Sequence, residues 1–407
     1  MADAGPRSLL SPAEAERLVA EAMPRLGTDR LPLDLARGRV LREDVIADRP
    51  LPPFDRVTLD GYALRAADAA GASAEFTISG FQPAGHPPLS LPASPGHCIE
   101  VATGAVLPDG ADCVVPYEKV ERADNRVILR CAEAPRPGDA VHARGSDRQA
   151  GSLLLRSGAR LRGRELAVAA SCGRTDLLVS SRPRIGLLVT GDELADPGAP
   201  VMPWQQRRSN DVVLRSVLEA AGAEVRCRHV GDDATRMGAM LAELLEVSDF
   251  VVTTGGVSKG RLDLLPDLLS RAGATSRFHG VAQRPGKPLW FGLSGGRPVF
   301  GLPGNPVSSF VCLHRYVLPA LGCAAGAAAR PVDFVPLVEP VRSDRVLTLY
   351  VPAVLVRGGS GGRMARLVPT NTSGDLTALV DTDGFVEIPP DGGSLPAGFL
   401  APFRPWA

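Results

Sequence analysis

The feature of this sequence that most constrains its fold is an alternation of strand-like and helix-like segments over residues 182–321. Short apolar runs alternate with segments whose apolar residues recur at helical spacing, in the order 184–190, 209–222, 224–230, 234–247, 249–254 and 262–272. Such alternation is typical of a largely parallel sheet with helices on both faces. Ligands of these folds bind beyond the carboxyl ends of the strands, so we expect a site there.

The expected carboxyl ends carry acidic residues and glycines in series. Glu193, Asp232 and Asp263 each follow one of the strands, and carboxylate oxygens are ligands that Mg²⁺ prefers. A further turn can present backbone N–H groups to a phosphate; it contains Gly255, Gly256 and Ser258. Each feature alone fits an ordinary turn or helix cap, but several at one sheet edge indicate a binding site for a nucleotide-like or phosphorylated ligand.

A dense run at residues 284–308 predicts a hairpin with a loop at each end. The apolar runs 289–293 and 298–302 are bounded by glycine and proline, as buried strands are. Arg284 and Lys287 precede the hairpin, and both can hold oxyanions.

The loop after the hairpin ends in Asn305 and Pro306, which can cap and begin a helix over 306–321. A helix start at the end of a strand is a natural anion site. A turn followed by a capped helix would explain the same residues without a ligand.

The remaining chain divides by composition into three further parts. Residues 54–143 and 331–407 show short β-like runs between Gly/Pro turns. Residues 1–53 and 144–181 have mixed character, with helices expected after the capping box at Ser11 and near 163–171. We expect these two helices to pack together in one discontinuous domain, with the α/β domain spanning 182–330.

Bulk properties exclude several classes of protein. Lys+Arg and Asp+Glu both number 45, which argues against nucleic acid as the main partner. The seven cysteines show no CxxC spacing and the histidines stand alone, so neither a disulfide framework nor a zinc site is indicated. There is no basic signal-like N-terminus and no apolar run near the ~20 residues of a membrane span. We expect a cytoplasmic protein that does not enter a membrane.

Several segments, in order along the chain, make it similar to a known family: PPFDRVTLDGYALR (52–65), ATGAVLPDGADCVVPYE (102–118), GLLVTGDEL (186–194), SND (209–211), TTGGVSKGRLD (253–263), RPGKPLWFG (284–292) and FGLPGNPVSSF (300–310). The chain resembles the MoeA family, the molybdopterin molybdenumtransferases, which includes the C-terminal domain of gephyrin.

The resemblance implies a multidomain α/β plus β fold. A MogA/MoaB-like α/β domain would join a β-rich lever domain, a split helical linker domain and a C-terminal β-barrel-like domain. It implies a homodimer with intersubunit sites, and as partners a MogA/MoaB-type adenylyltransferase and molybdoenzyme apoproteins. The implied reaction inserts molybdate into adenylylated molybdopterin with Mg²⁺ and releases AMP.

The resemblance also assigns roles to matched residues. The lever-side or interdomain residues would be Asp60, Thr103 and Asp147. The catalytic, metal-binding acids would be Glu193, Asp232 and Asp263, with Asp263 needed to cleave the adenylate. The pterin pocket would contain Pro303, Gly304 and Asn305. Contacts to molybdate or phosphate would come from Ser258, Arg284, Lys287 and Thr377.

Departures from the family pattern leave alternatives open. Gly280 stands where the family has a lysine, and Pro352 where it has an arginine; of two hydroxyls in the tail only Thr377 remains. Lys259 would restore a positive charge nearby. A non-catalytic molybdopterin-binding carrier or scaffold is therefore the alternative function, and tungstate is an alternative to molybdate.

Overall fold

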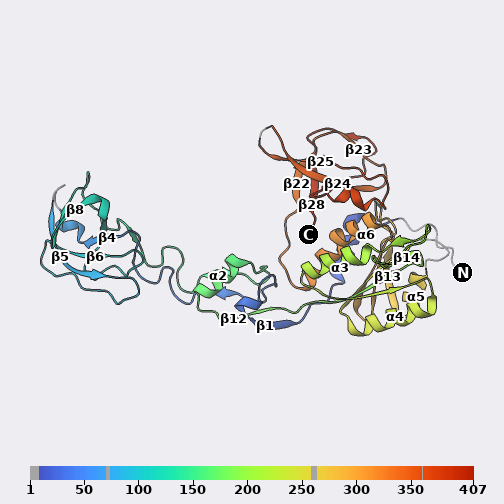
Figure 1. Ribbon diagram of the computed structural model, residues 1–407, viewed down its shortest axis with the longest axis horizontal. Coiled ribbons are helices and arrows are strands. Elements are labelled where there is room, and N and C mark those ends of the chain that lie inside the picture. Colours follow the sequence, from blue (N-terminus) through green and yellow to red (C-terminus); the bar gives the residue numbers. More distant parts are fainter. Residues whose placement is uncertain (1–8, 70–73, 258–263, 360) are drawn as a thin grey trace. The chain divides into compact units, whose positions relative to one another are not determined.

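The computed structural model describes residues 9–69, 74–257, 264–359 and 361–407 (Figure 1). The chain forms two compact units. One contains Met1–Glu43, Ser157–Gly163 and Asp176–Ala407, and the other contains Asp44–Arg156 and Arg164–Thr175. The finer division into four domains remains a prediction.

The alternating segment forms a six-stranded mixed sheet in the larger unit. Its order is β16 (Glu224–Val230), β13 (Arg184–Thr190), β17 (Phe250–Thr254), β21 (Arg297–Leu302), β20 (Trp290–Ser294) and β18 (Ala274–His279). The pairs among the first four strands are parallel, as predicted. The predicted hairpin β20–β21 is antiparallel, and β18, which the sequence did not reveal, extends it antiparallel.

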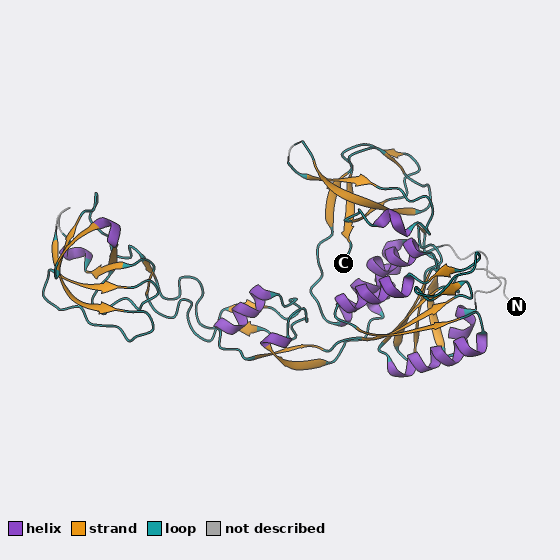
Figure 2. Cartoon of the chain, viewed as in Figure 1, coloured by secondary structure: helices purple, strands orange, loops and turns teal. Residues whose placement is uncertain are grey.

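Helices cover both faces of this sheet, as predicted (Figure 2). The elements are α3 (Asn210–Ala220), α4 (Ala234–Val247), α5 (Leu265–Arg271), α6 (Pro306–Cys312) and α7 (Leu318–Ala324), with a π-helical turn, Leu313–Val317, between the last two. Leu187 packs in a core with α3 and α6, whereas the next residue, Leu188, packs in a core with α4 and α5. Side chains of a strand alternate between faces, so a continuous apolar run such as β13 requires helices on both sides.

The first helix, α1 (Pro12–Glu21), begins with the predicted capping box. The Ser11 side chain accepts a hydrogen bond from the Glu14 N–H, and the Glu14 carboxylate accepts one from the Ser11 N–H. The expected packing of α1 beside the second helix stays a prediction. Ala15 and Val19 of α1 belong to the core that contains α7, whereas most of α2 (Gly163–Ser171) falls in the smaller unit. Apolar spacing defines the buried face of α1 but not its partner.

The C-terminal residues form strands, as predicted. The sheet order is β19 (Gln283–Arg284), β24 (Thr348–Arg357), β26 (Gly384–Ile388), β28 (Leu400–Pro405) and β22 (Asp333–Pro336), with β25 (Arg363–Leu367) also paired to β24. Within the same part of the chain, the short strands β23 (Val341–Arg342) and β27 (Ser394–Leu395) form a separate antiparallel pair. The first strand, β19, was not expected, because it belongs to the loop that precedes the hairpin β20–β21.

The smaller unit contains a second β-rich region. Its six-stranded sheet has the order β7 (Cys113–Pro116), β4 (Gly61–Leu64), β6 (His97–Val101), β5 (Glu75–Gln82), β9 (Arg126–Leu129) and β8 (Val120–Ala123). Short pairs join β3 (Arg56–Val57) to β10 (Val141–His142) and β2 (Val45–Ile46) to β11 (Leu153–Leu155). In the larger unit, β1 (Thr28–Pro32) pairs with β12 (Asp176–Ser180).

The helical stretch Pro306–Ala324 is long and apolar enough to cross a membrane by length and composition. However, 78% of its apolar window is buried inside the protein. Among the described residues, this stretch therefore has the character of a core helix.

Candidate functional site

A cleft of about 650 Å³ opens at the carboxyl edge of the parallel strands in the larger unit. Its walls come from the turns after β13, β17 and β21, from the segment that leads into α3, and from a loop of the C-terminal region. The lining includes Thr190, Glu193, Gln206, Arg207, Arg208, Asn210, Asp232, Gly255, Gly256, Pro303, Gly304, Asn305, Thr372 and Gly374. Seven residues predicted from the sequence therefore meet in one cleft.

Two carboxylates line this cleft, those of Glu193 and Asp232. No hydrogen bond or ion pair of either carboxylate is recorded among the described residues, so their oxygens are available to a ligand. Mg²⁺ is commonly held by one or two carboxylates together with substrate phosphates, and the two side chains fit that role. The described residues contain no group of three His, Cys, Asp or Glu that could hold a metal ion. Asp263 lies outside the described residues.

The turn after β17 requires glycine. Gly255 has φ +93°, and a Cβ placed on it would lie 2.6 Å from Thr190 Oγ1 and 2.8 Å from the Thr190 carbonyl oxygen. Gly256 also has a positive φ, +65°. Only glycine adopts such conformations without strain, and the absent side chains let the backbone approach a ligand. Ser258, the third predicted residue of this turn, lies outside the described residues.

The loop after β21 is fixed by hydrogen bonds to strand β17 and to the start of helix α3. Thr254 Oγ1 donates to the Pro303 carbonyl (3.1 Å), and Asn210 Nδ2 donates to the Gly304 carbonyl (2.7 Å). Asn305 stands at the N-cap position of α6, but its side chain does not cap the helix. Its Nδ2 donates to Ser373 Oγ (2.6 Å) instead. Asn305 thus takes the predicted N-cap position, but its side chain is bonded to the C-terminal region and does not cap the helix.

The cations before the hairpin do not line the cleft, although the next residue, Pro288, does. The Arg284 side chain is 68% exposed and lies 3.8 Å from Asp344 Oδ2. Lys287 is exposed. The loop between them is held by the buried Gln283, whose Nε2 donates to the Gly286 carbonyl (3.2 Å) and whose Oε1 accepts from the Tyr316 hydroxyl.

Among the departures from the family pattern, Gly280 has a local structural explanation. Gly280 has φ +100°, a conformation in which a lysine would be strained, so the backbone at this position is suited to glycine. Pro352 lies within β24, where its carbonyl accepts from the Val368 N–H. Thr377 Oγ1 donates to Asp375 Oδ1 (2.8 Å), which lowers the pKa of that carboxyl. Lys259 lies outside the described residues.

The predicted lever-side residues all lie in the smaller unit. The exposed Asp60 carboxylate accepts hydrogen bonds from the Thr103 N–H (2.6 Å) and the Thr103 hydroxyl (2.8 Å). These two bonds lower the pKa of Asp60, so it is an anion near neutral pH. Asp147 Oδ1 lies 2.9 Å from His142 Nε2. Asp60 and Thr103 thus form one polar cluster.

Sequence reasoning missed two cations that line the cleft, Arg207 and Arg208. Arg208 forms ion pairs with Asp196 (2.5 Å) and Asp211 (3.5 Å). Arg207 is exposed, and no partner of its side chain is recorded in the described part of the chain. Both arginines directly precede α3, the helix that follows β13, and this position in the sequence could have indicated that they lie at the cleft.

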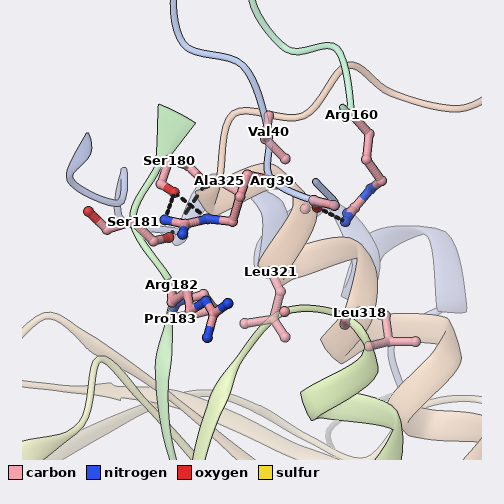
Figure 3. A pocket seen from close by; sticks show the side chains of 14 residues that line it. Arg39, Val40, Arg160, Ser180, Ser181, Arg182, Pro183, Leu318, Leu321 and Ala325 are labelled. Carbon is pink, nitrogen blue, oxygen red and sulfur yellow. Dashed lines mark hydrogen bonds between the residues drawn. The ribbon is translucent and has the colours of Figure 1, made fainter. Parts of the chain in front are cut away.

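A second, small pocket of about 40 Å³ is also rich in arginine (Figure 3). Arg39 donates to the Ser180 carbonyl and to Asp29, and burial lowers the pKa of Arg160. The pocket lies at the C-terminal ends of α3 and α7, since Gly222 and Ala325 line it. Arg39 bonds to Asp29 and the Ser180 carbonyl, and Arg160 donates to the Gly38 carbonyl (3.0 Å), so both arginines have protein partners without a bound anion.

Three family descriptions match consecutive parts of the chain. Residues 10–173 match the MoeA N-terminal region (domain I and II), and residues 186–322 match a probable molybdopterin binding domain. Residues 335–406 match the MoeA C-terminal region (domain IV). Together they account for most of both compact units.

Similar proteins match the chain along nearly its whole length. A molybdopterin molybdenumtransferase of Synechocystis is 36% identical over 405 residues, which covers 98% of this chain and 100% of that protein. Molybdopterin molybdenumtransferase 2 of Mycobacterium tuberculosis is 33% identical, and the match covers 95% of this chain and 96% of that protein. A crystal structure of the molybdopterin biosynthesis moeA protein of Pyrococcus horikoshii has a TM-score of 0.83 at 27% identity, and the match covers 98% of this chain and 100% of that one.

Proposed function

Because this chain belongs to the MoeA family, we propose that it inserts molybdate into adenylylated molybdopterin and releases AMP, as a transferase of molybdenum cofactor biosynthesis. Relatives with the name molybdopterin molybdenumtransferase match it from end to end. The observation that carries the proposal is the 650 Å³ cleft, which combines two carboxylates that bond to no other described residue, a glycine turn and the loop after β21. A phosphorylated substrate and a divalent cation need that set of groups.

Different cleft-lining residues would contact different parts of the substrate. Pro303, Gly304 and Asn305 would contact the pterin, and the N–H groups at Gly255 and Gly256 would donate to a phosphate. Glu193 and Asp232, with Asp263, would hold Mg²⁺. When bound, the ion would offset the negative charge that the phosphoanhydride carries as it breaks.

Further residues would hold the second anion. Molybdate is a dianion, and Arg284, Lys287, Ser258 and Thr377 are proposed to contact it. Lys287 immediately precedes Pro288, which lines the cleft. This proximity along the chain supports the molybdate assignment for the loop before the hairpin.

The lever-side cluster is proposed to complete the site of a second subunit. Asp60 and Thr103 are exposed and joined by two hydrogen bonds, and Asp147 is exposed as well. In a homodimer, they would supply polar contacts to the substrate held by the other copy. We place this enzyme in the cytoplasm, with a MogA/MoaB-type adenylyltransferase as its source of substrate and molybdoenzyme apoproteins as recipients.

The decisive test is molybdate-dependent release of AMP. Purified full-length protein, adenylylated molybdopterin, Mg²⁺ and molybdate should yield AMP, and omission of molybdate should stop it. The variant Asp263→Ala should retain the adenylate, so unchanged turnover in that variant would contradict the catalytic assignment. Tight pterin binding without AMP release would instead favour the carrier or scaffold. A parallel reaction with tungstate would decide between the two oxyanions.

A further inference from the structure

We infer that Arg207 binds the phosphate-bearing end of the substrate. Two separate parts of the protein would then bind the two anions: Arg207, which lines the cleft, would bind the phosphates, and the loop before the hairpin would bind molybdate. This inference rests on the proposed function, because that function supplies the phosphorylated substrate.

The backbone of Arg207 is fixed at the rim of the cleft. The short strands β14 (Leu194–Ala195) and β15 (Gln206–Arg207) pair in parallel. The Gln206 N–H donates to the Glu193 carbonyl (2.8 Å), and the Arg208 N–H donates to the Ala195 carbonyl (2.9 Å). Arg207 is therefore attached to the same turn that presents the Glu193 carboxylate, close to the proposed metal ligands.

The charges of the cleft leave Arg207 as its available cation among the described lining residues. Arg208 already faces two carboxylates, Asp196 and Asp211. The Arg207 guanidinium bonds to no residue in the part of the chain that the structure describes, and its side chain is exposed. The lining otherwise carries the negative charges of Glu193 and Asp232. A substrate with two phosphate groups adds more negative charge, which backbone N–H groups alone do not neutralise.

The chemistry of arginine fits a phosphate rather than a solvated surface position. A guanidinium donates two parallel hydrogen bonds to phosphate oxygens, and it stays charged at any pH in the working range. An arginine without a role would be expected on the solvent face of an element, as Arg215 is on α3, where it pairs with Glu219 (2.7 Å). Arg207 instead lines a 650 Å³ cleft.

The test measures anion binding directly on the full chain. Inorganic pyrophosphate and AMP would be titrated into wild-type protein with Mg²⁺, and isothermal titration calorimetry would measure their affinities. Arg207→Gln should weaken binding of both probes about tenfold, the effect of losing one charge-assisted pair. Arg207→Lys should recover part of the loss, because it keeps the charge but not the two-pronged geometry.

The matched control is Arg215→Gln, which removes the same charge from an exposed position outside the cleft. It should bind both probes as the wild type does. Equal affinities of wild type and Arg207→Gln would overturn the inference, as would an equal loss in Arg207→Gln and Arg215→Gln. Failure of wild-type protein to bind either probe would overturn it too.

Turnover separates this inference from the proposed function. If wild type releases AMP with molybdate, Arg207→Gln should raise KM for adenylylated molybdopterin about tenfold and leave KM for molybdate unchanged. Normal AMP release by a variant with unchanged KM would contradict the role of Arg207 alone. Absence of AMP release in the wild type, with Arg207-dependent binding of pyrophosphate intact, would contradict the proposed function alone.

Discussion

The two loops that flank the hairpin β20–β21 resemble each other in sequence but differ in structure. Both are rich in glycine and proline, and both lie at the same edge of the sheet, because Trp290 at the start of β20 pairs with Gly301 near the end of β21. The loop after β21 is bound to β17 through Thr254 and to the start of α3 through Asn210, and it lines the cleft. The loop before β20 is instead bound to the C-terminal sheet through β19 and β24.

This difference shows what decides whether a polar loop becomes part of a site. Strand direction places both loops at the carboxyl edge of the sheet. Whether the side chains of a loop reach the cleft then depends on long-range contacts. Strand β19 pairs with a strand more than 60 residues away, and Arg284 lies near Asp344 rather than in the cleft. A cation in the sequence motif is therefore not by itself a cation of the cleft.

The largest expected effect concerns the cleft itself. Asp232→Asn should lower molybdate-dependent AMP release about 10³-fold, because it removes a proposed metal ligand worth several kcal/mol to the reaction. The Asp232 carboxylate has no recorded partner in the described part of the chain, so thermal unfolding should be unchanged. Activity restored by higher Mg²⁺ would confirm the role in metal binding. Full activity at every Mg²⁺ concentration would contradict it.

A pair of glycines tests the structural difference between the two loops. Gly286, before β20, has φ +91°, and a Cβ there would lie 2.5 Å from Cys312 Sγ and 2.7 Å from Gln283 Nε2. Gly286→Ala should therefore lower the free energy of unfolding by about 2 kcal/mol. A Cβ at Gly304, after β21, meets nothing closer than 3.5 Å.

The matched variant Gly304→Ala should change stability by less than about 0.5 kcal/mol, while it narrows the cleft and raises KM for the adenylylated substrate. Urea denaturation of the full chain, followed by steady-state kinetics, would measure both effects. Equal stability of the two variants would show that the two loops are anchored alike.

Local patterns predicted the elements well, and their failures have physical causes. The sequence predicts the bounds of β16 and α4 to the residue, because apolar spacing and glycine turns are local signals. The role of Asn305 could not be read locally, since Ser373 accepts its hydrogen bond from 68 residues away. Arg207 was missed because two adjacent arginines before a helix also occur on ordinary surfaces. The residues predicted to line the cleft shared one detectable feature, a position directly after a strand.

The smallest expected effect is also the sharpest test of the separate anion ends. Lys287 is exposed and stands beside Pro288, which lines the cleft, so its attraction for molybdate is screened by water and worth at most about 1 kcal/mol. Lys287→Gln should therefore raise KM for molybdate about threefold and leave KM for adenylylated molybdopterin unchanged, the reverse of Arg207→Gln. Kinetics with each substrate varied in turn would show this. If both variants raised the same KM, Arg207 and Lys287 would serve one anion, and the proposed separation of the phosphate and molybdate sites would be wrong.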